Sequence, residues 1–170
     1  MASYITLPQL AEKPGAVELA QVTAQPGLPP VAFAVLDAVL RGNDTSGFNP
    51  QDVDKAFQSV ARIDEVVRDT QALIDGFLRQ RGYKLPFNRV PRILTTWTRA
   101  IVRYYLHQHL ITDEPKNPIA RDYRDALRLL QMVTEGKFSL GLEDELTQAA
   151  GNPQAVAPER VFTLDTLRDY

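Results

Sequence analysis

Apolar residues along this chain recur at steps of three and four, the spacing that places them on one face of a helix. The longest such run follows Asn49, a good helix N-cap, and Pro50, which suits the first helical position. Its seam consists of Val53, Phe57, Val60, Ile63, Val67, Ile74 and Phe77, with Thr70 filling one step. The pattern predicts a helix from Pro50 to about Gln80, about 46 Å long at 1.5 Å per residue.

This helix is longer than the core of a small domain requires, since such a core is about 30 Å across. One interpretation is a bent or broken pair of helices inside a bundle. The other is a single helix that packs against neighbouring subunits as well as against its own chain. We favour the second.

Shorter helices are predicted on both sides of the long one. Thr6 and Gln9 have the spacing of a capping box, and Gly42 stands where a left-handed C-terminal cap belongs. The predicted ranges are 6–12, 16–23, 31–42, 91–110 and 118–135, with breaker-rich loops between them. We therefore predict an all-α fold, a helical bundle with one long central helix.

The composition changes after Leu142. Residues 143–159 are polar and aperiodic, and the last eleven residues carry a new apolar cluster. The segment begins at Arg160, and its apolar residues are Val161, Phe162, Leu164, Leu167 and Tyr170. We expect residues 1–142 to form the helical domain and 143–170 to be a flexible linker with a docking arm. The arm could dock on its own domain or on a partner, and we favour a partner.

Composition removes several kinds of chemistry. The 170 residues are 44% hydrophobic and 24% charged, which is typical of one globular domain. There is no cysteine, so disulfides and thiolate metal sites are excluded. The two histidines, His107 and His109, would point about 200° apart on a helix and cannot share a metal. No phosphate loop, HExxH or GxSxG motif occurs, so we expect no enzyme and no cofactor.

Other absences bear on location. No apolar run approaches the eighteen or so residues of a membrane span, and no basic stretch precedes an apolar one near Met1. We expect no membrane partner and no export signal.

Charge is unevenly distributed along the chain. The net charge is −2, but residues 76–112 contain no acidic residue and seven basic ones, and the remainder is −9. The seven are Arg79, Arg81, Lys84, Arg89, Arg92, Arg99 and Arg103. Such a split can attract copies of the same chain or a polyanion, and the sequence does not decide between them.

A nucleic-acid interpretation uses the 79–103 window. Lys84 and Arg89 lie at a bend that also carries Tyr83 and Phe87. The two basic side chains could contact the DNA backbone. Base-reading side chains are not concentrated there, and the sequence pI is about 5.7. Pairing with acidic surfaces of another subunit explains the window equally well. A helical packaging or regulatory protein that binds nucleic acid remains the alternative.

The order of several short motifs resembles one protein family. Tyr4 to Leu10 has the form Tyr-x-x-x-x-x-Leu, Ile74 to Leu78 reads IDGFL, and Arg81 to Phe87 reads RGYKLPF. VPRIL, IVRYYL, RDYRDALRLL and GKFSLG follow from Val90 onward, and RVFTLDTL begins at Arg160. This series resembles the Mu-like neck proteins of tailed phages, a family of head–tail connector (adaptor, or head-completion) subunits. Residues 26–49 depart from the pattern and look like an inserted helix and loop.

The resemblance implies a structural virion protein. Such connectors form a ring beneath the portal, usually of twelve copies, extend the DNA channel and present a platform for the tail. The implied partners are further copies of the chain, the portal protein, a tail-side neck or tail-terminator protein, and the packaged DNA in the channel. The implied location is the neck of the virion, after assembly in the host cytoplasm.

Contacts in such a ring can be assigned to residues only as expectations. Acidic residues of one copy would lie near basic residues of the next. The acidic candidates are Asp52, Asp54, Glu65 and Asp69, and the basic ones are Arg79, Arg81 and Arg89. The arm would dock on the portal or on an adjacent subunit.

Overall fold

The computed structural model describes residues 3–24 and 27–142, and the fold is all-α, as predicted. The elements are α1 (Leu7–Leu10), a π-helical turn η1 (Ala11–Gly15), α2 (Ala16–Val22), α3 (Phe33–Arg41), α4 (Pro50–Arg81), α5 (Arg92–His107), a 3-10 turn η2 (Gln108–Leu110) and α6 (Pro118–Thr134). The predicted linker and arm, residues 143–170, lie outside the described residues.

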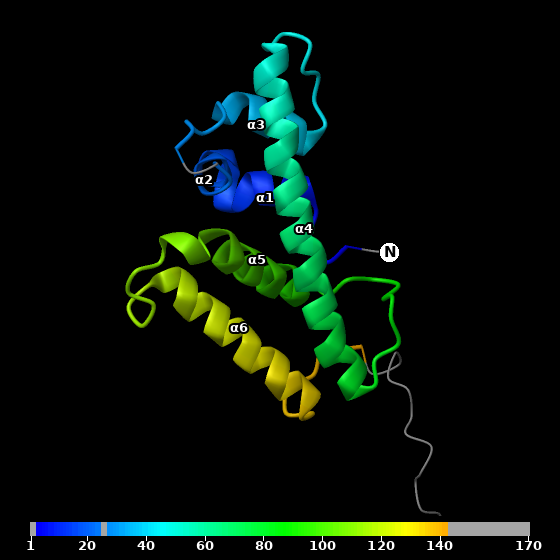
Figure 1. The fold of residues 1–170 in the computed structure, drawn as a ribbon. Coiled ribbons are helices and arrows are strands. Elements are labelled where there is room, and N and C mark those ends of the chain that lie inside the picture. Colours follow the sequence, from blue (N-terminus) through cyan, green and yellow to red (C-terminus); the bar gives the residue numbers. More distant parts are fainter. Residues whose placement is uncertain (1–2, 25–26, 143–170) are drawn as a thin grey trace, which may run out of the picture.

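Helix α4 is the spine of the molecule (Figure 1). It runs for 32 residues without a break, about 48 Å. The Asn49 side chain accepts a hydrogen bond from the Gln51 N–H at 2.9 Å, so the predicted N-cap is confirmed. Gly82, with φ 97°, ends the helix in the left-handed conformation that a glycine adopts without strain. The broken-pair interpretation is therefore wrong.

Two hydrophobic clusters pack against successive halves of α4. The upper cluster, with α1, α2 and α3, is centred on Leu10, Leu19, Leu36, Leu40 and Ile63. The lower cluster, with α5 and α6, is centred on Ile74, Leu78, Leu94, Ile101 and Leu130. Every one of these side chains is at most 2% exposed. The long helix thus serves two cores of its own chain, and its length alone does not require a neighbouring subunit.

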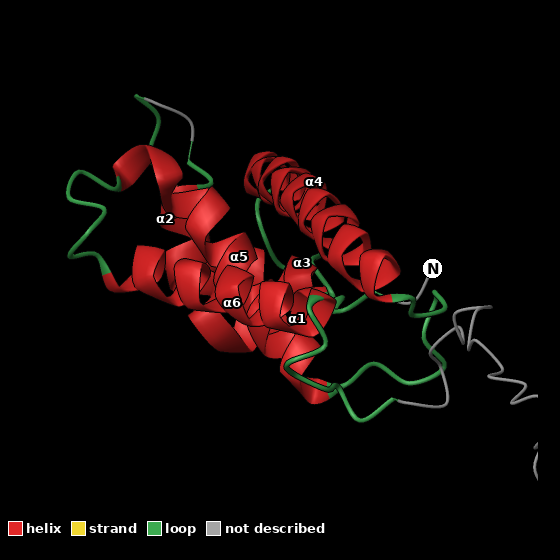
Figure 2. Cartoon of the chain, turned by 90° about the horizontal axis from the view of Figure 1, so that it is seen from below, coloured by secondary structure: helices red, strands yellow, loops and turns green. Residues whose placement is uncertain are grey.

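The two clusters lie on the same side of the spine. In Figure 2, seen from below, the other helices lie to one side of α4. The opposite side of α4 is left exposed along its length, at Asp54, Ala61, Glu65, Ala72 and Gly76. This asymmetry sets the surfaces available to partners.

The N-terminal segment joins the two clusters. Tyr4 belongs to the lower cluster, with its ring 6.3 Å from that of Phe87, while the next residue, Ile5, belongs to the upper cluster. The Thr6–Gln9 capping box is present, as predicted. The predicted helix to residue 12 is shorter than expected, because α1 passes into η1 and the backbone leaves helical geometry at Lys13, before Pro14.

Residues 26–49 are part of the upper core where they are described. Helix α3 buries Val35, Leu36 and Leu40 against α4 and the N-terminal helices. Gly42 caps it with φ 69°, as predicted. The segment that resembles an insertion therefore helps to build the domain.

The predicted seam of α4 needs two corrections. Phe57 is 55% exposed, and the buried position belongs to Ala56, which is 0% exposed. Phe77 is half-buried, and its neighbour Leu78 takes the fully buried place. Consecutive residues point about 100° apart on a helix, so a one-residue difference moves a side chain from the core to a flank.

Candidate assembly surfaces

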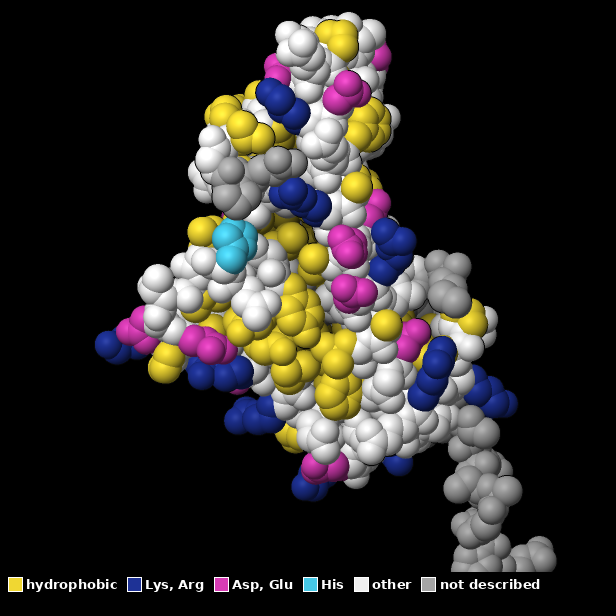
Figure 3. All heavy atoms as spheres, in the orientation of Figure 1, with side chains coloured by type: hydrophobic (Ala, Val, Ile, Leu, Met, Phe, Trp, Pro, Cys, Tyr) yellow, Lys and Arg dark blue, Asp and Glu magenta, His cyan; other side chains and the backbone are white. Residues whose placement is uncertain are grey.

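The exposed side of α4 carries most of the predicted contact residues. Asp54, Glu65 and Asp69 are exposed and Asp52 is half-buried. Figure 3 shows charged side chains of both signs along the spine and apolar side chains gathered beside its lower half. These carboxylates are accessible to a partner.

The predicted basic partners are exposed but lie at the other end of the spine. Arg79 and Arg81 are in the last turn of α4, and Arg89 is in the loop that follows. Along the axis, Arg79 is about 15 Å from Asp69 and about 40 Å from Asp52. Pairing these groups between copies would require neighbouring spines to be strongly tilted or shifted along their axes.

A wide groove runs beside the lower half of α4. It has a volume of about 810 Å³ and includes the side chains of Asp64, Arg68, Asp75 and Arg79, together with Ser3 from the N-terminal segment. Arg79 lies 4.0 Å from Asp75, a long contact between a largely exposed guanidinium and a half-buried carboxylate. Charges of alternating sign suit a protein partner better than a polyanion.

Several cations of the basic window are engaged inside the chain. Arg81 lies across Gly136, where an added Cβ would be 3.1 Å from the arginine Cζ. This places the guanidinium at the C-terminal end of α6, which favours a cation. Arg103 is paired with Glu18. The window therefore offers fewer free charges than its sequence suggests.

The aromatic part of the window is also internal. Tyr83 and Phe87 are 5% and 4% exposed and pack edge to face with ring centroids 5.7 Å apart. They support the lower cluster and are not available to stack on bases. Lys84 and Arg89 are exposed on the same segment, so both side chains are accessible to the phosphates of a DNA backbone.

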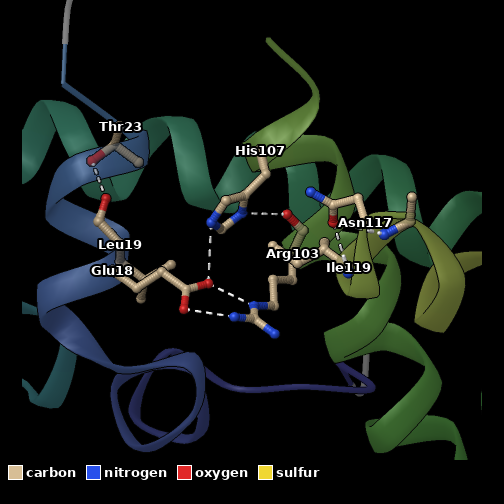
Figure 4. A network of polar contacts seen from close by, with 8 residues as sticks. Glu18, Leu19, Thr23, Arg103, His107, Asn117 and Ile119 are labelled. Atoms are coloured by element: carbon tan, nitrogen blue, oxygen red, sulfur yellow. Dashed lines mark hydrogen bonds and ion pairs between the residues drawn. The ribbon is translucent and has the colours of Figure 1, made fainter. Parts of the chain in front are cut away.

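A bidentate ion pair joins α2 to α5 (Figure 4). Arg103 donates from Nε to Glu18 Oε1 at 2.6 Å and from Nη2 to Oε2 at 2.8 Å, and this bonding raises the pKa of the guanidinium. His107 Nδ1 lies 2.7 Å from the Arg103 carbonyl oxygen, and its Nε2 lies 3.2 Å from Glu18. His107 thus has a structural role, and His109 is exposed. Glu18 and Arg103 are 85 residues apart, and no local pattern in the sequence predicts this network.

A cluster of three tyrosines covers the outer end of α5 and α6. Tyr104 and Tyr123 stack with centroids 4.0 Å apart and planes 5° apart, and Tyr105 packs against both. Burial and the hydrogen bond with Tyr105 raise the pKa of Tyr123 to about 12. Tyr104 and Tyr105 are half-buried, and they stabilise the contact between two helices.

A small pocket opens beside the upper half of α4. It has a volume of about 80 Å³ and is lined by Thr23, Ala24, Leu28, Pro29, Val31, Lys55, Gln58, Ser59 and Arg62. An Arg62 Nη1 N–H donates to the Thr23 carbonyl at 2.8 Å and fixes one wall. The pocket is partly apolar and has a cationic rim.

Among residues 3–24 and 27–142, no group of three or more histidine or acidic side chains is placed to hold a metal ion. Within the same part of the chain, no helix is both long enough and apolar enough to cross a membrane. The predicted arm residues, Arg160 to Tyr170, lie beyond this part.

Taken with these surfaces, comparison with known families identifies the class of protein. The family model described as "Bacteriophage Mu, Gp36" matches residues 4–157, which include both hydrophobic clusters and the whole of α4. The chain belongs to this phage protein family.

Two curated proteins are similar to the chain over about half its length. It is 36% identical over 85 residues to the "Mu-like prophage FluMu protein gp36" of Haemophilus influenzae (strain ATCC 51907 / DSM 11121 / KW20 / Rd), covering 50% of this chain and 57% of that protein. It is 31% identical over 91 residues to "Gene product J" of Escherichia phage Mu, covering 54% of this chain and 59% of that protein. The matched part spans somewhat over half of each relative.

Proposed function

We propose that this chain is a structural subunit of the phage neck, a head–tail connector that forms a ring beneath the portal. The ring would extend the DNA channel and provide the platform on which the tail attaches. Membership of the Gp36 family supports a phage role, and the order of motifs resembles that of connector proteins.

The observation that carries the proposal is the one-sided packing of α4. The spine buries one face against two cores of its own chain and leaves the opposite face exposed over its length. Its two flanks differ, because one carries the mixed-charge groove and the other carries the small pocket and its cationic rim. A rigid element with two unlike flanks suits heterologous side-by-side contacts, which close into a cyclic ring.

The resemblance to connector proteins supplies the partners in this proposal. The ring would consist of about twelve copies, with the portal on one side and a tail-side neck or tail-terminator protein on the other. The arm from Arg160 to Tyr170 would dock on the portal or on an adjacent subunit, and packaged DNA would pass through the centre. Many weak arms acting together would give a strong joint, because each bound arm raises the effective concentration of the next.

Sedimentation of the full chain with its cognate portal tests this function. We expect a complex that contains one portal ring and many copies of the chain. The proposal is overturned if the chain remains monomeric and the portal sediments unchanged at micromolar concentrations of both.

The alternative is that the chain binds nucleic acid through the 79–103 window, at and after the C-terminal end of α4. Lys84, Arg89 and Arg92 are exposed there, and this favours some contact with phosphates. The burial of Tyr83 and Phe87 counts against base recognition. Retention on duplex DNA that falls steeply between 50 and 200 mM salt, to roughly a thousandth or less, would support the alternative.

A further inference from the structure

Phe57 is an apolar side chain that belongs to neither of the two hydrophobic clusters. It is 55% exposed on α4, although Ala56 beside it is completely buried. A single exposed apolar residue is common and needs no partner. On the other flank of the same helix, however, there is a pocket that could receive such a side chain.

The small pocket lies at the same height as Phe57. Its lining from α4 comprises Lys55, Gln58, Ser59 and Arg62, whose midpoint is about 2 Å from Phe57 along the helix axis. At 100° per residue, this set is centred about 150° around the helix from Phe57. The exposed apolar side chain and the pocket therefore lie on opposite flanks, and the two cannot meet within one chain.

The pocket can accept part of an aromatic ring. Leu28, Pro29 and Val31 give it an apolar wall, and Leu28 is itself 58% exposed. Its volume of about 80 Å³ is roughly half that of an apolar cavity of about 150 Å³ that takes up benzene. The open mouth admits the edge of a phenyl ring, while the rest of that ring stays on its own helix.

The charges around the two features are complementary. On the flank of Phe57, Asp54 precedes it by three residues and Asp64 follows by seven, so both lie on its side of α4. The pocket has Lys55 and Arg62 on its rim. Lys55 makes an exposed contact of 3.6 Å to Asp52, which costs little to exchange. Arg62 uses one N–H toward Thr23 and has five in all.

We propose that Phe57 of one copy inserts into the pocket beside Leu28 of the next copy, with Asp54 and Asp64 facing Lys55 and Arg62. The partner is thus a second copy of this chain in a head-to-tail contact. This inference rests on the proposed ring and names a contact that holds it together. In this contact the paired charges lie at the same height on neighbouring spines. The pairing expected from the sequence, between α4 carboxylates and Arg79 or Arg81, would instead join groups at different heights.

The angle between the flanks gives the row of copies a curvature. The smaller arc from Phe57 to the pocket, about 150°, runs over the exposed face of α4 with Ala61, Glu65 and Ala72. A row joined at this angle curves toward that face and closes after roughly ten to twenty copies. The exposed face of the spine would then line the inside of the ring.

Cysteine cross-linking tests the contact, because the natural chain contains no cysteine. One full-length protein carries Phe57→Cys and another carries Leu28→Cys, and they are treated with a short bismaleimide alone and mixed, free and on the portal. We expect a covalent dimer only in the mixture, since each cysteine alone faces a surface that has none. Asp54→Cys with Leu28→Cys repeats the test with Phe57 intact. Val17→Cys, at a side chain 54% exposed on α2, is the matched control and should give no dimer.

The outcomes separate this contact from the ring itself. Multimers that sediment as rings but give no dimer from either mixture overturn the contact and leave the ring standing. A dimer from Phe57→Cys alone indicates a two-fold contact and also overturns it. A chain that stays monomeric, free and with the portal, overturns the ring and this contact together. Phe57→Ala should weaken association at least tenfold, whereas Val17→Ala should leave it unchanged.

Discussion

Glu18 and Arg103 are 85 residues apart in the sequence, and their side chains form a bidentate ion pair that ties α2 to α5. The pair is only partly exposed, at 25% and 35% of the two side chains. It connects the helices of the upper cluster to a helix that also supports the lower one. The relative position of the two halves of the domain therefore depends on a polar contact as well as on the spine.

Glu18→Gln should lower the free energy of unfolding by about 1–2 kcal/mol, because the amide is uncharged and keeps only one acceptor oxygen, so that one of the two hydrogen bonds from Arg103 is lost. Urea denaturation measures the change. Asp37→Asn is the matched control, since the Asp37–Arg41 pair is 36% exposed on both sides and lies within one helix. Its effect should be at most about 0.5 kcal/mol. Equal effects of the two substitutions would contradict the role given to Glu18.

Thr70 is a buried hydroxyl between the two clusters. It is 0% exposed, lies between Val67 and Ile74 on the buried face of α4, and its Oγ1 has no hydrogen-bond partner among residues 3–24 and 27–142. Thr70→Val should raise the free energy of unfolding by about 1 kcal/mol, because the buried polar atom is removed at constant shape. Thr98 is the control. It is equally buried, but its Oγ1 donates to the Leu94 carbonyl at 2.7 Å, so Thr98→Val should not stabilise the protein.

Alkaline pH should destabilise the fold through its tyrosines. Burial and the hydrogen bond to Asp75 raise the pKa of Tyr4, and that of Tyr123 is raised to about 12. The unfolded tyrosine pKa is about 10. The folded values are the higher ones, so their stabilising contribution is complete below about pH 10 and is lost as pH rises from 10 through 12.

Tyr4→Phe separates this effect from other titrations. The variant should be less stable than the natural chain at pH 8, because it lacks the hydrogen bond to Asp75. Its stability should then fall less steeply between pH 10 and 11.5. Urea denaturation followed by circular dichroism at each pH gives both values. Parallel curves for the two proteins would show that Tyr4 does not contribute to the alkaline loss.

Removal of residues 160–170 should leave the helical domain folded and prevent it from joining purified portals. The expectation follows from the apolar residues of the arm, which need a surface to cover them. A pull-down with the portal measures the loss. A full-length variant with Phe162, Leu164 and Leu167 all changed to Ser keeps the chain length and should lose binding as well. Unchanged capture of both variants would refute the role of the arm.

Much of the fold was predictable because its signals are local. The cap at Asn49 and the glycine stop at Gly42 depend on a few neighbouring residues, and the structure has both where the sequence predicts them. The period of three and four along α4 also predicted one continuous helix. When two neighbouring residues are both apolar, as Ala56 and Phe57 are, the period does not decide which of them is buried. Phe57 was therefore assigned to the core in place of Ala56.

The surfaces were less predictable because they depend on contacts between distant segments. In the sequence Arg103 has no acidic residue near it, but in the structure α2 places Glu18 beside it. The sequence places Tyr83 and Phe87 on a bend among basic residues, but both are buried in the lower cluster, where Tyr4 from the other end of the domain packs against Phe87. The pocket at Leu28 joins a loop to the flank of α4, and no pattern in either segment indicates it.

Electron-microscopy class averages of the full chain bound to its cognate portal are the most direct test of the central claim, that copies of this chain join side by side into a closed ring. We expect an added layer with the rotational order of a ring, in which long helices surround the channel. A portal that carries isolated, unconnected copies of the chain, or no additional layer at saturating concentrations, would contradict it.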